Sequence, residues 1–263
     1  LNKITNPKND NQGMAICRRS VAPWDQYYRC FSNSCKQNFK LDYGKTISFI
    51  ARFLGQFATL VVIGVMAGQY ILREGSAGFF ASERSRDQAD IILAFLIAFQ
   101  SSKASGLLSF TPDMHWYSMK IKKPKWTPPN IIFPIVWIPL KFCQVLATLM
   151  VWREMQRDAL TIPMLAFFLQ ACLGDLWNFV FFQEKYIGAG VMVILSLLAS
   201  MLYTINEYCN VYRPAGLLLV PTAVWLIVAS ALNIHIWILN GKEALFPYQR
   251  KDMCRSNPRR YFS

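Results

Sequence analysis

The sequence predicts an all-α integral membrane protein with six transmembrane helices. Hydrophobic residues make up 54% of its 263 residues, charged residues make up only 16%, and the mean hydropathy is +0.24. A soluble globular domain typically has about 25% charged residues. In addition, six apolar segments approach the length of about 20 residues that spans the hydrocarbon core of a bilayer as a helix.

The predicted segments lie at roughly 47–72, 88–110, 128–152, 159–183, 187–209 and 215–240. In the first segment, the spacing of Gly64 and Gly68 lets another helix backbone approach closely. Small residues are also common in membrane spans, so this spacing can equally be incidental. The second segment is the least regular, because polar residues 100–103 interrupt it. By itself it could be an interfacial or re-entrant piece.

The net charge of +13 supports the count of six helices. Basic residues concentrate in the N-terminal tail (1–46), the loop 103–127 and the C-terminal tail (241–263). Six spans place all three on one side, and the positive-inside rule makes it the cytosol-, matrix- or stroma-like side. We therefore expect both termini there, in an organellar membrane of mitochondrion or plastid. Since the basic residues flank apolar runs, the expected partner is the lipid bilayer and not nucleic acid.

Four cysteines, Cys17, Cys30, Cys35 and Cys254, fall outside the predicted spans on the positive side. Such compartments are usually reducing, which disfavours disulfides. A four-thiolate metal site is the alternative, but the sequence has no Cys-x-x-Cys pair here. The prediction is that these four residues are free thiols.

The segment 116–130 combines aromatic residues, lysines and prolines directly before an apolar run. Tryptophan and tyrosine suit the headgroup layer, and lysine suits the water-facing side of an anionic bilayer. Proline at a first helical turn removes no hydrogen bond that the helix would make. The pattern predicts a membrane-surface segment that leads into a buried helix. Its defining residues are Trp116, Tyr117, Lys123, Pro124, Trp126, Thr127, Pro128, Pro129 and Asn130.

Over about residues 88–240 the chain resembles the translocator protein family, also called tryptophan-rich sensory proteins (TspO/MBR). The resemblance rests on the segment just described and on motifs in the later helices. These are Val136-Trp137, Gln170, Trp177 with Phe181-Phe182, Pro221-x-x-x-Trp225 and Leu232-Asn233-x-x-Ile236-Trp237. Family members are five-helix bundles. The resemblance therefore implies a five-helix bundle over 88–240. The basic, Cys-containing tail (1–46), the additional transmembrane helix (47–72) and the basic tail (241–263) lie outside it.

The resemblance also implies a ligand pocket between the helices. Members of the family are associated with porphyrins, haem and sterols. Trp137 and Trp225 match a tryptophan pair that faces the tetrapyrrole in bacterial members and supports its light-dependent breakdown. The implied ligand-binding residues are Trp137, Trp225, Trp177, Gln170, Ala229 and Asn233. The implied loop over the pocket contains Trp116, Tyr117, Pro124, Trp126, Pro128 and Pro129. The alternative is that Trp137 and Trp225 are ordinary packing residues.

The implied cofactor is a tetrapyrrole such as a porphyrin, a haem or a chlorophyll. His235 lies in the last span, where a neutral imidazole could be an axial ligand to its metal. An interhelical hydrogen bond is the plainer alternative for His235. The sequence contains no phosphate-binding loop, nucleophile elbow or His-Glu-x-x-His motif, so we expect a binding protein and not an enzyme.

Departures from the family pattern support a second hypothesis. Ile234 replaces the tyrosine of the sterol-associated motif, and the basic residue that should follow Trp237 is missing, so sterol binding through that motif is not predicted. Lys141 replaces a tyrosine expected after Val136-Trp137. The chain could instead be a non-catalytic subunit of a photosynthetic or respiratory supercomplex, or could pair with itself.

Within the spans, Lys141 and Asp175 are ionisable and costly unless they are paired or face water. An ion pair between them is one possibility. Snorkelling of Lys141 is the other.

Overall fold

The computed structural model describes residues 39–74, 86–92 and 113–249. Within these ranges, five helices are long and apolar enough to cross a membrane, which confirms the all-α membrane fold. Most of the predicted segment 88–110 lies outside the described residues. So do Cys17, Cys30, Cys35 and Cys254.

Five predicted segments correspond to observed helices. The helices are α2 (Tyr43–Glu74), α5 (Ile132–Glu154), α6 (Ile162–Asn178) with its continuation η1 (Phe179–Gln183), α7 (Ile187–Val211) and α8 (Arg213–Leu239). A short helix, α4 (Met114–Met119), precedes α5, and residues 86–92 are also helical. Prolines lie in the first turns of α6 and α8, where the helix loses no hydrogen bond.

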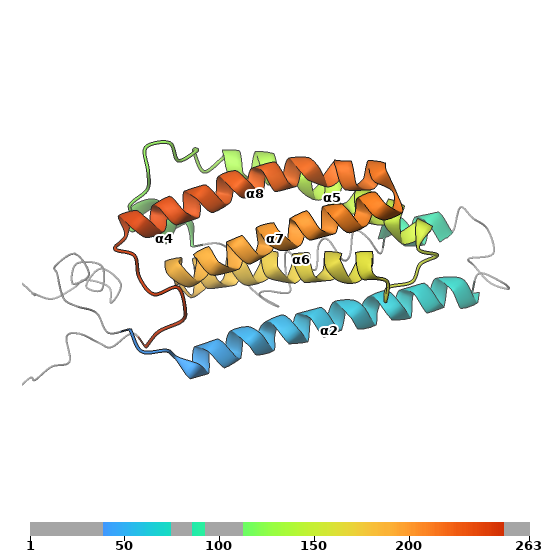
Figure 1. The fold of residues 1–263 in the computed structure, drawn as a ribbon, viewed down its shortest axis with the longest axis horizontal. Coiled ribbons are helices and arrows are strands. Elements are labelled where there is room, and N and C mark those ends of the chain that lie inside the picture. The colour runs from blue at the N-terminus through green and yellow to red at the C-terminus, as the bar shows by residue number, and fades with distance from the viewer. Residues whose placement is uncertain (1–38, 75–85, 93–112, 250–263) are drawn as a thin grey trace, which may run out of the picture. The chain divides into compact units, whose positions relative to one another are not determined.

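The long helices run alongside one another (Figure 1). Helix α8 packs against α5 and α7, and α6 packs against α7 and α2. The core between them is almost entirely apolar, with fully buried side chains such as Phe168, Met201 and Leu219. Burial of this apolar surface between the helices gives the bundle its close packing.

Helix α2 approaches the bundle through its two inward glycines. A Cβ atom on Gly64 would lie 2.8 Å from the Cβ of Ala159, and one on Gly68 would overlap the carbonyl oxygen of Arg157. The backbone of α2 can come this close only because both positions lack a side chain. Closer to the middle of α2, the Gln56 amide donates a hydrogen bond to the Asp175 carboxylate of α6.

The start of α2 is fastened to the segment that follows α8. Asp42 N–H donates to the Pro247 carbonyl (2.9 Å), and Lys45 forms an ion pair with Glu184 (2.6 Å) in the turn between η1 and α7. The buried Glu243 accepts a hydrogen bond from the N–H of Gly188 (2.9 Å), in the first turn of α7. A carboxylate at this position also suits the positive end of the helix dipole.

The opposite end of the bundle contains a buried carboxylate, Asp90. It forms two hydrogen bonds with the guanidinium of Arg157 (3.1 and 2.8 Å) and accepts a third from the indole of Trp152 (3.0 Å). Arg153 lies 3.5 Å from the same carboxylate. These contacts fix residues 86–92 against the end of α5.

Candidate functional site

A cavity of about 410 Å³ lies between α5, the end of α6 with η1, and α8, next to α4. This volume is within the range of about 300–1,000 Å³ that is typical of small-molecule sites. The wall is predominantly apolar and aromatic. The lining residues are Tyr117, Asn130, Phe133, Pro134, Trp137, Trp177, Asn178, Phe181, Phe182, Ala229, Leu232, Asn233 and Ile236.

A π-helical turn forms the most aromatic part of the wall. In η1, the N–H of Glu184 bonds to the carbonyl of Phe179 (3.0 Å), so the turn contains one residue more than an α-helical turn. The turn brings both Phe181 and Phe182 to the cavity. Phe181 stacks on Trp177, with ring centroids 5.4 Å apart and planes 17° apart, and Phe182 stands edge-on to Trp177. Extended aromatic faces of this kind suit a flat ligand.

Helix α4 supplies Tyr117 to the cavity. It begins at Asp113, whose carboxylate accepts the N–H of Trp116 (2.8 Å) and pairs with Lys185 (2.9 Å). The Trp116 N–H, and then the Lys185 ammonium, lower the pKa of Asp113 below its usual value. Burial raises the pKa of Tyr117 to about 12, so its phenol stays neutral at physiological pH.

The loop between α4 and α5 is tied to the end of α8. The indole N–H of Trp126 donates to Nδ1 of His235 (3.0 Å). The Asn240 side chain accepts the N–H of Lys122 (3.1 Å) and donates to its carbonyl (2.8 Å). Within the loop, the Pro124 carbonyl accepts both the N–H and the hydroxyl of Thr127. The loop is therefore held next to the cavity by contacts from two directions.

Five residues of the predicted site line this one cavity: Tyr117, Trp137, Trp177, Ala229 and Asn233. They come from four elements, α4, α5, α6 and α8. Because Trp137 and Trp177 belong to different helices, the cavity has an indole ring on two of its sides.

The remaining predicted residues lie outside the lining. Trp225 stands edge-on to Phe133, which does line the cavity, with ring centroids 6.3 Å apart. Gln170 is buried in α6, and Trp116 is buried in α4 against Phe181. The loop residues Pro124, Trp126, Pro128 and Pro129 and the α8 residue His235 are not among the lining residues.

Several lining residues were not predicted, although the sequence contains a signal for some of them. Ala229, Leu232, Asn233 and Ile236 follow the spacing of one helix face, so two predicted members of this set indicate the other two. Phe181 lies one helical turn after Trp177. Phe133 lies one helical turn before Trp137 and has the same signal, whereas Asn178 has none, because it is adjacent to Trp177 and not one turn away from it.

Two residues of the cavity lining have buried polar groups without partners. Among the described residues, neither the indole N–H of Trp177 nor the amide nitrogen or oxygen of Asn233 has a hydrogen-bond partner, and the same holds for Trp225 and Ser230 outside the lining. Asn233 is only 2% exposed. Since buried polar groups in folded proteins are nearly always paired, these groups suit a site that a polar ligand atom completes.

The donor set of the cavity does not suit a metal. Its lining, as far as the structure describes it, contains no histidine, cysteine or methionine, and Tyr117 is held as a neutral phenol. Nor do the described ranges contain a cluster of three His, Cys, Asp or Glu side chains. Nδ1 of His235 is already an acceptor for Trp126.

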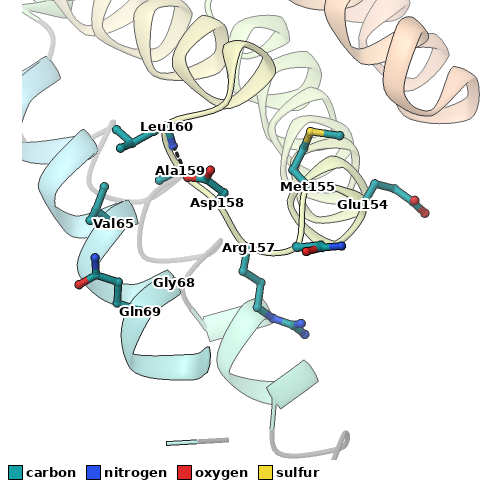
Figure 2. A pocket seen from close by; sticks show the side chains of 10 residues that line it. Val65, Gly68, Gln69, Glu154, Met155, Arg157, Asp158, Ala159 and Leu160 are labelled. Atoms are coloured by element: carbon teal, nitrogen blue, oxygen red, sulfur yellow. Dashed lines mark hydrogen bonds between the residues drawn. The ribbon is translucent and has the colours of Figure 1, made fainter. Parts of the chain in front are cut away.

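A second cavity, of about 530 Å³, lies at the opposite end of the bundle (Figure 2). Val65, Gly68 and Gln69 of α2 face the turn between α5 and α6 across it. The charged groups in that turn are already engaged, because Arg157 binds Asp90 and Asp158 accepts the N–H of Leu160 (2.8 Å). We therefore assign the candidate site to the aromatic cavity.

The ionisable residues of the spans lie outside this site. The Asp175 carboxylate accepts a hydrogen bond from Gln56 of α2. Among the described side chains, Lys141 is not within ion-pair distance of Asp175, but the two are close enough for their charges to attract each other. Asp175 therefore connects the first described helix to the bundle, a partnership that the sequence did not predict.

Comparison with known proteins matches the chain to the TspO/MBR family over residues 91–238. It is 31% identical to protein CrtK of Rhodobacter capsulatus over 154 residues, which cover 58% of this chain and 94% of that protein. It is 33% identical to the tryptophan-rich protein TspO of Chlorobaculum tepidum over 137 residues, 50% of this chain and 85% of that protein. The translocator protein of Bos taurus is 28% identical over 125 residues, 46% of this chain and 73% of that protein. Helix α2 precedes the residues matched by the family.

Proposed function

Since the chain belongs to the TspO/MBR family of integral membrane proteins, we propose that it binds a tetrapyrrole or another flat apolar ligand in the aromatic cavity. The observation that carries this proposal is the composition of the wall. Trp137 lies on α5, the stacked rings of Trp177 and Phe181 lie on α6 and η1, and together they line one cavity of about 410 Å³. A flat conjugated ligand gains both apolar burial and ring stacking from such a wall.

The wall favours a ligand without a metal that needs an axial bond. The iron of a haem is usually held by an imidazole, a thiolate, a thioether or a phenolate. The described lining has none of the first three, and the raised pKa of Tyr117 disfavours a phenolate. A metal-free porphyrin fits this set of side chains better. Unpaired N–H groups, such as that of Trp177, would donate to polar atoms on the ligand.

We propose binding and not turnover. The described lining contains no carboxylate, histidine or cysteine, and the hydroxyl of Tyr117 is a neutral phenol, so the wall offers no base or activated nucleophile at physiological pH. In light-dependent breakdown of a bound porphyrin, the light-excited porphyrin itself would start the reaction. The indole rings of the wall could take part only as secondary reactants.

A titration of the purified chain with protoporphyrin, followed by the Soret absorbance, tests the proposal. We expect saturable binding that Trp137→Phe weakens by about three- to tenfold, because stacking area is lost. Trp152→Phe is the matched control. Trp152 lies on the same helix but contacts Asp90 at the far end, so affinity should not change. Non-saturable uptake, or equal loss in both variants, would contradict a site in this cavity.

The cavity end of the bundle also suggests an orientation. Lys122, Lys123 and Lys125 lie in the loop at this end, and Lys123 lies 4.6 Å from the centre of the Tyr117 ring. By the positive-inside rule we propose that this end faces a cytosol-, matrix- or stroma-like compartment of an organellar membrane. In sealed vesicles, impermeant maleimide should label the peptide carrying Lys125→Cys and that carrying Asp158→Cys from opposite sides. Labelling from the same side would contradict the orientation.

The second candidate function is a structural subunit of a larger membrane assembly. One observation favours it. Helix α2 contacts the described bundle along one side only and exposes large apolar residues such as Ile47, Ile50 and Leu54 on the other. Lipid or another membrane protein could cover this side. Co-migration with a much larger complex on a native gel, together with no protoporphyrin binding, would favour this function over ligand binding.

A further inference from the structure

Among the asparagines that line the cavity, Asn233 is the one whose side-chain amide has no hydrogen-bond partner in the described part of the chain. The cavity is lined by three asparagines. The amide nitrogen of Asn130 donates to Ser118 (2.9 Å), and that of Asn178 donates to the Gly174 carbonyl (3.0 Å). The Asn233 amide has no partner at either its nitrogen or its oxygen among the described residues, although the residue is 2% exposed.

The described residues around Asn233 contact its side chain but form no hydrogen bond with its amide. A Cβ atom on Gly190 of α7 would lie 3.1 Å from the Phe181 ring and 3.8 Å from the Asn233 amide nitrogen. The second distance is an ordinary van der Waals contact, so the amide nitrogen lies next to a residue of α7 that has no side chain to accept its hydrogen bond. Leu232 and Ile236, the neighbouring lining residues of α8, are apolar and cannot pair with it.

We propose that Asn233 is the specificity-determining residue of the site, and that it recognises a flat ligand with a hydrogen-bond donor and acceptor side by side on one edge. This proposal rests on the proposed function, because it concerns the same cavity. A carboxamide offers an N–H and a C=O in the same plane, so it forms two parallel hydrogen bonds with a lactam, whose N–H and C=O are fixed cis.

The apolar wall narrows the chemistry further. Next to the Asn233 amide, an ionised carboxylate would have acceptors but no donor and would meet no charged lining residue among those described, so the propionates of a porphyrin would have to stay away from this amide. A neutral lactam pairs with both atoms of the amide and carries no charge to desolvate. The preferred ligand class is therefore an aromatic or conjugated lactam, with a flat apolar body for Trp177 and Phe181.

Three matched probes test this recognition on the full chain in detergent. They are phenanthridin-6(5H)-one, its N-methyl derivative, and phenanthrene, which lacks both polar atoms. Ligand fluorescence is titrated with protein and corrected for partition into empty micelles. We expect the unmethylated lactam to bind about tenfold more tightly than either analogue, the effect of two hydrogen bonds made in a dry site. Asn233→Leu should abolish this preference, so that the lactam binds no more tightly than its N-methyl derivative.

Ser230→Ala is the control variant. Ser230 lies three residues earlier in α8 and also has a buried side-chain oxygen without a partner among the described residues, but it does not line the cavity. It should keep the lactam preference. Equal affinity of the wild-type chain for all three probes would overturn the role of Asn233 and leave the proposed function intact. No binding of any probe, together with no binding of protoporphyrin, would overturn both. If Asn233→Leu does not fold, the relative affinities of the wild-type chain for the lactam and its N-methyl derivative still test the recognition proposed for Asn233.

Discussion

The indole N–H of Trp126 donates a hydrogen bond to Nδ1 of His235, across 3.0 Å between the loop that follows α4 and the last turns of α8. Indole is a donor only, so this bond requires the imidazole nitrogen to carry no proton. Trp126 is 46% exposed, and the bond therefore fastens a surface side chain that packing alone would leave loose. It is one of two ties that hold the loop next to the cavity, the other being that of Asn240 with Lys122.

His235→Phe should accelerate release of a ligand from the cavity. Phenylalanine keeps a ring of similar size but removes the acceptor, so the loop loses one of its ties. One hydrogen bond of ordinary strength corresponds to a roughly three- to tenfold faster dissociation rate. Stopped-flow release of protoporphyrin into empty micelles measures it. Trp126→Phe should have the same effect, and the double variant no more than either single one. Additive effects would show that the two side chains act separately.

The link between Asp113 and Lys185 should make the anchoring of α4 dependent on pH. The pKa of Asp113 lies below its usual value of 3.8, chiefly because its carboxylate accepts the Trp116 N–H and then because Lys185 is close. The ionised form therefore stabilises the fold at neutral pH. This contribution is lost as the pH falls below about 4, through the lowered folded-state value.

Asp113→Asn tests this dependence, since asparagine can still cap the helix but has no charge to titrate. The thermal midpoints of wild type and variant, measured between about pH 6 and about pH 3, should differ at the upper end and converge at the lower end. Because Asp113 is partly exposed, we expect the difference to shrink in high salt. A gap that does not change with pH would mean that the variant acts through packing alone.

Two glycines of α2 should respond in opposite ways to alanine. A Cβ on Gly68 would overlap the backbone carbonyl of Arg157, whereas one on Gly55 would meet nothing within 4 Å. Gly68→Ala should therefore destabilise the protein by about 1–3 kcal/mol, as overpacking usually does. Gly55→Ala should be neutral or slightly stabilising, because alanine favours a helix. Thermal unfolding in detergent measures both. Equal midpoints for the two variants would contradict the packing of α2 on the turn before α6.

The sequence predicted five of the described helices to within a few residues, because hydropathy and span length alone set their positions. Through the family resemblance it predicted Tyr117, Trp137, Trp177, Ala229 and Asn233 near a pocket, and all five line the aromatic cavity. It did not predict that Trp225 lies behind the ring of Phe133, outside the lining. Such features depend on how one helix is rotated and shifted against another, which neither apolar periodicity nor a motif within one helix encodes.

The partner of Asp175 illustrates the same limit and leads to the last prediction. The carboxylate accepts a hydrogen bond from Gln56 on α2, a helix outside the residues matched by the family. Asp175 is buried, so Gln56→Leu should leave a polar group unpaired inside a span and lower the stability by about 1–3 kcal/mol. In the triple variant Gln56→Leu/Asp175→Leu/Lys141→Met the interacting polar groups are removed together, so its thermal midpoint should lie above that of Gln56→Leu alone. That recovery distinguishes a polar link between helices from apolar packing, since packing defects at neighbouring positions would accumulate instead. If Gln56→Leu is as stable as the wild type, Asp175 does not depend on α2, and the attachment of this helix rests on its glycines.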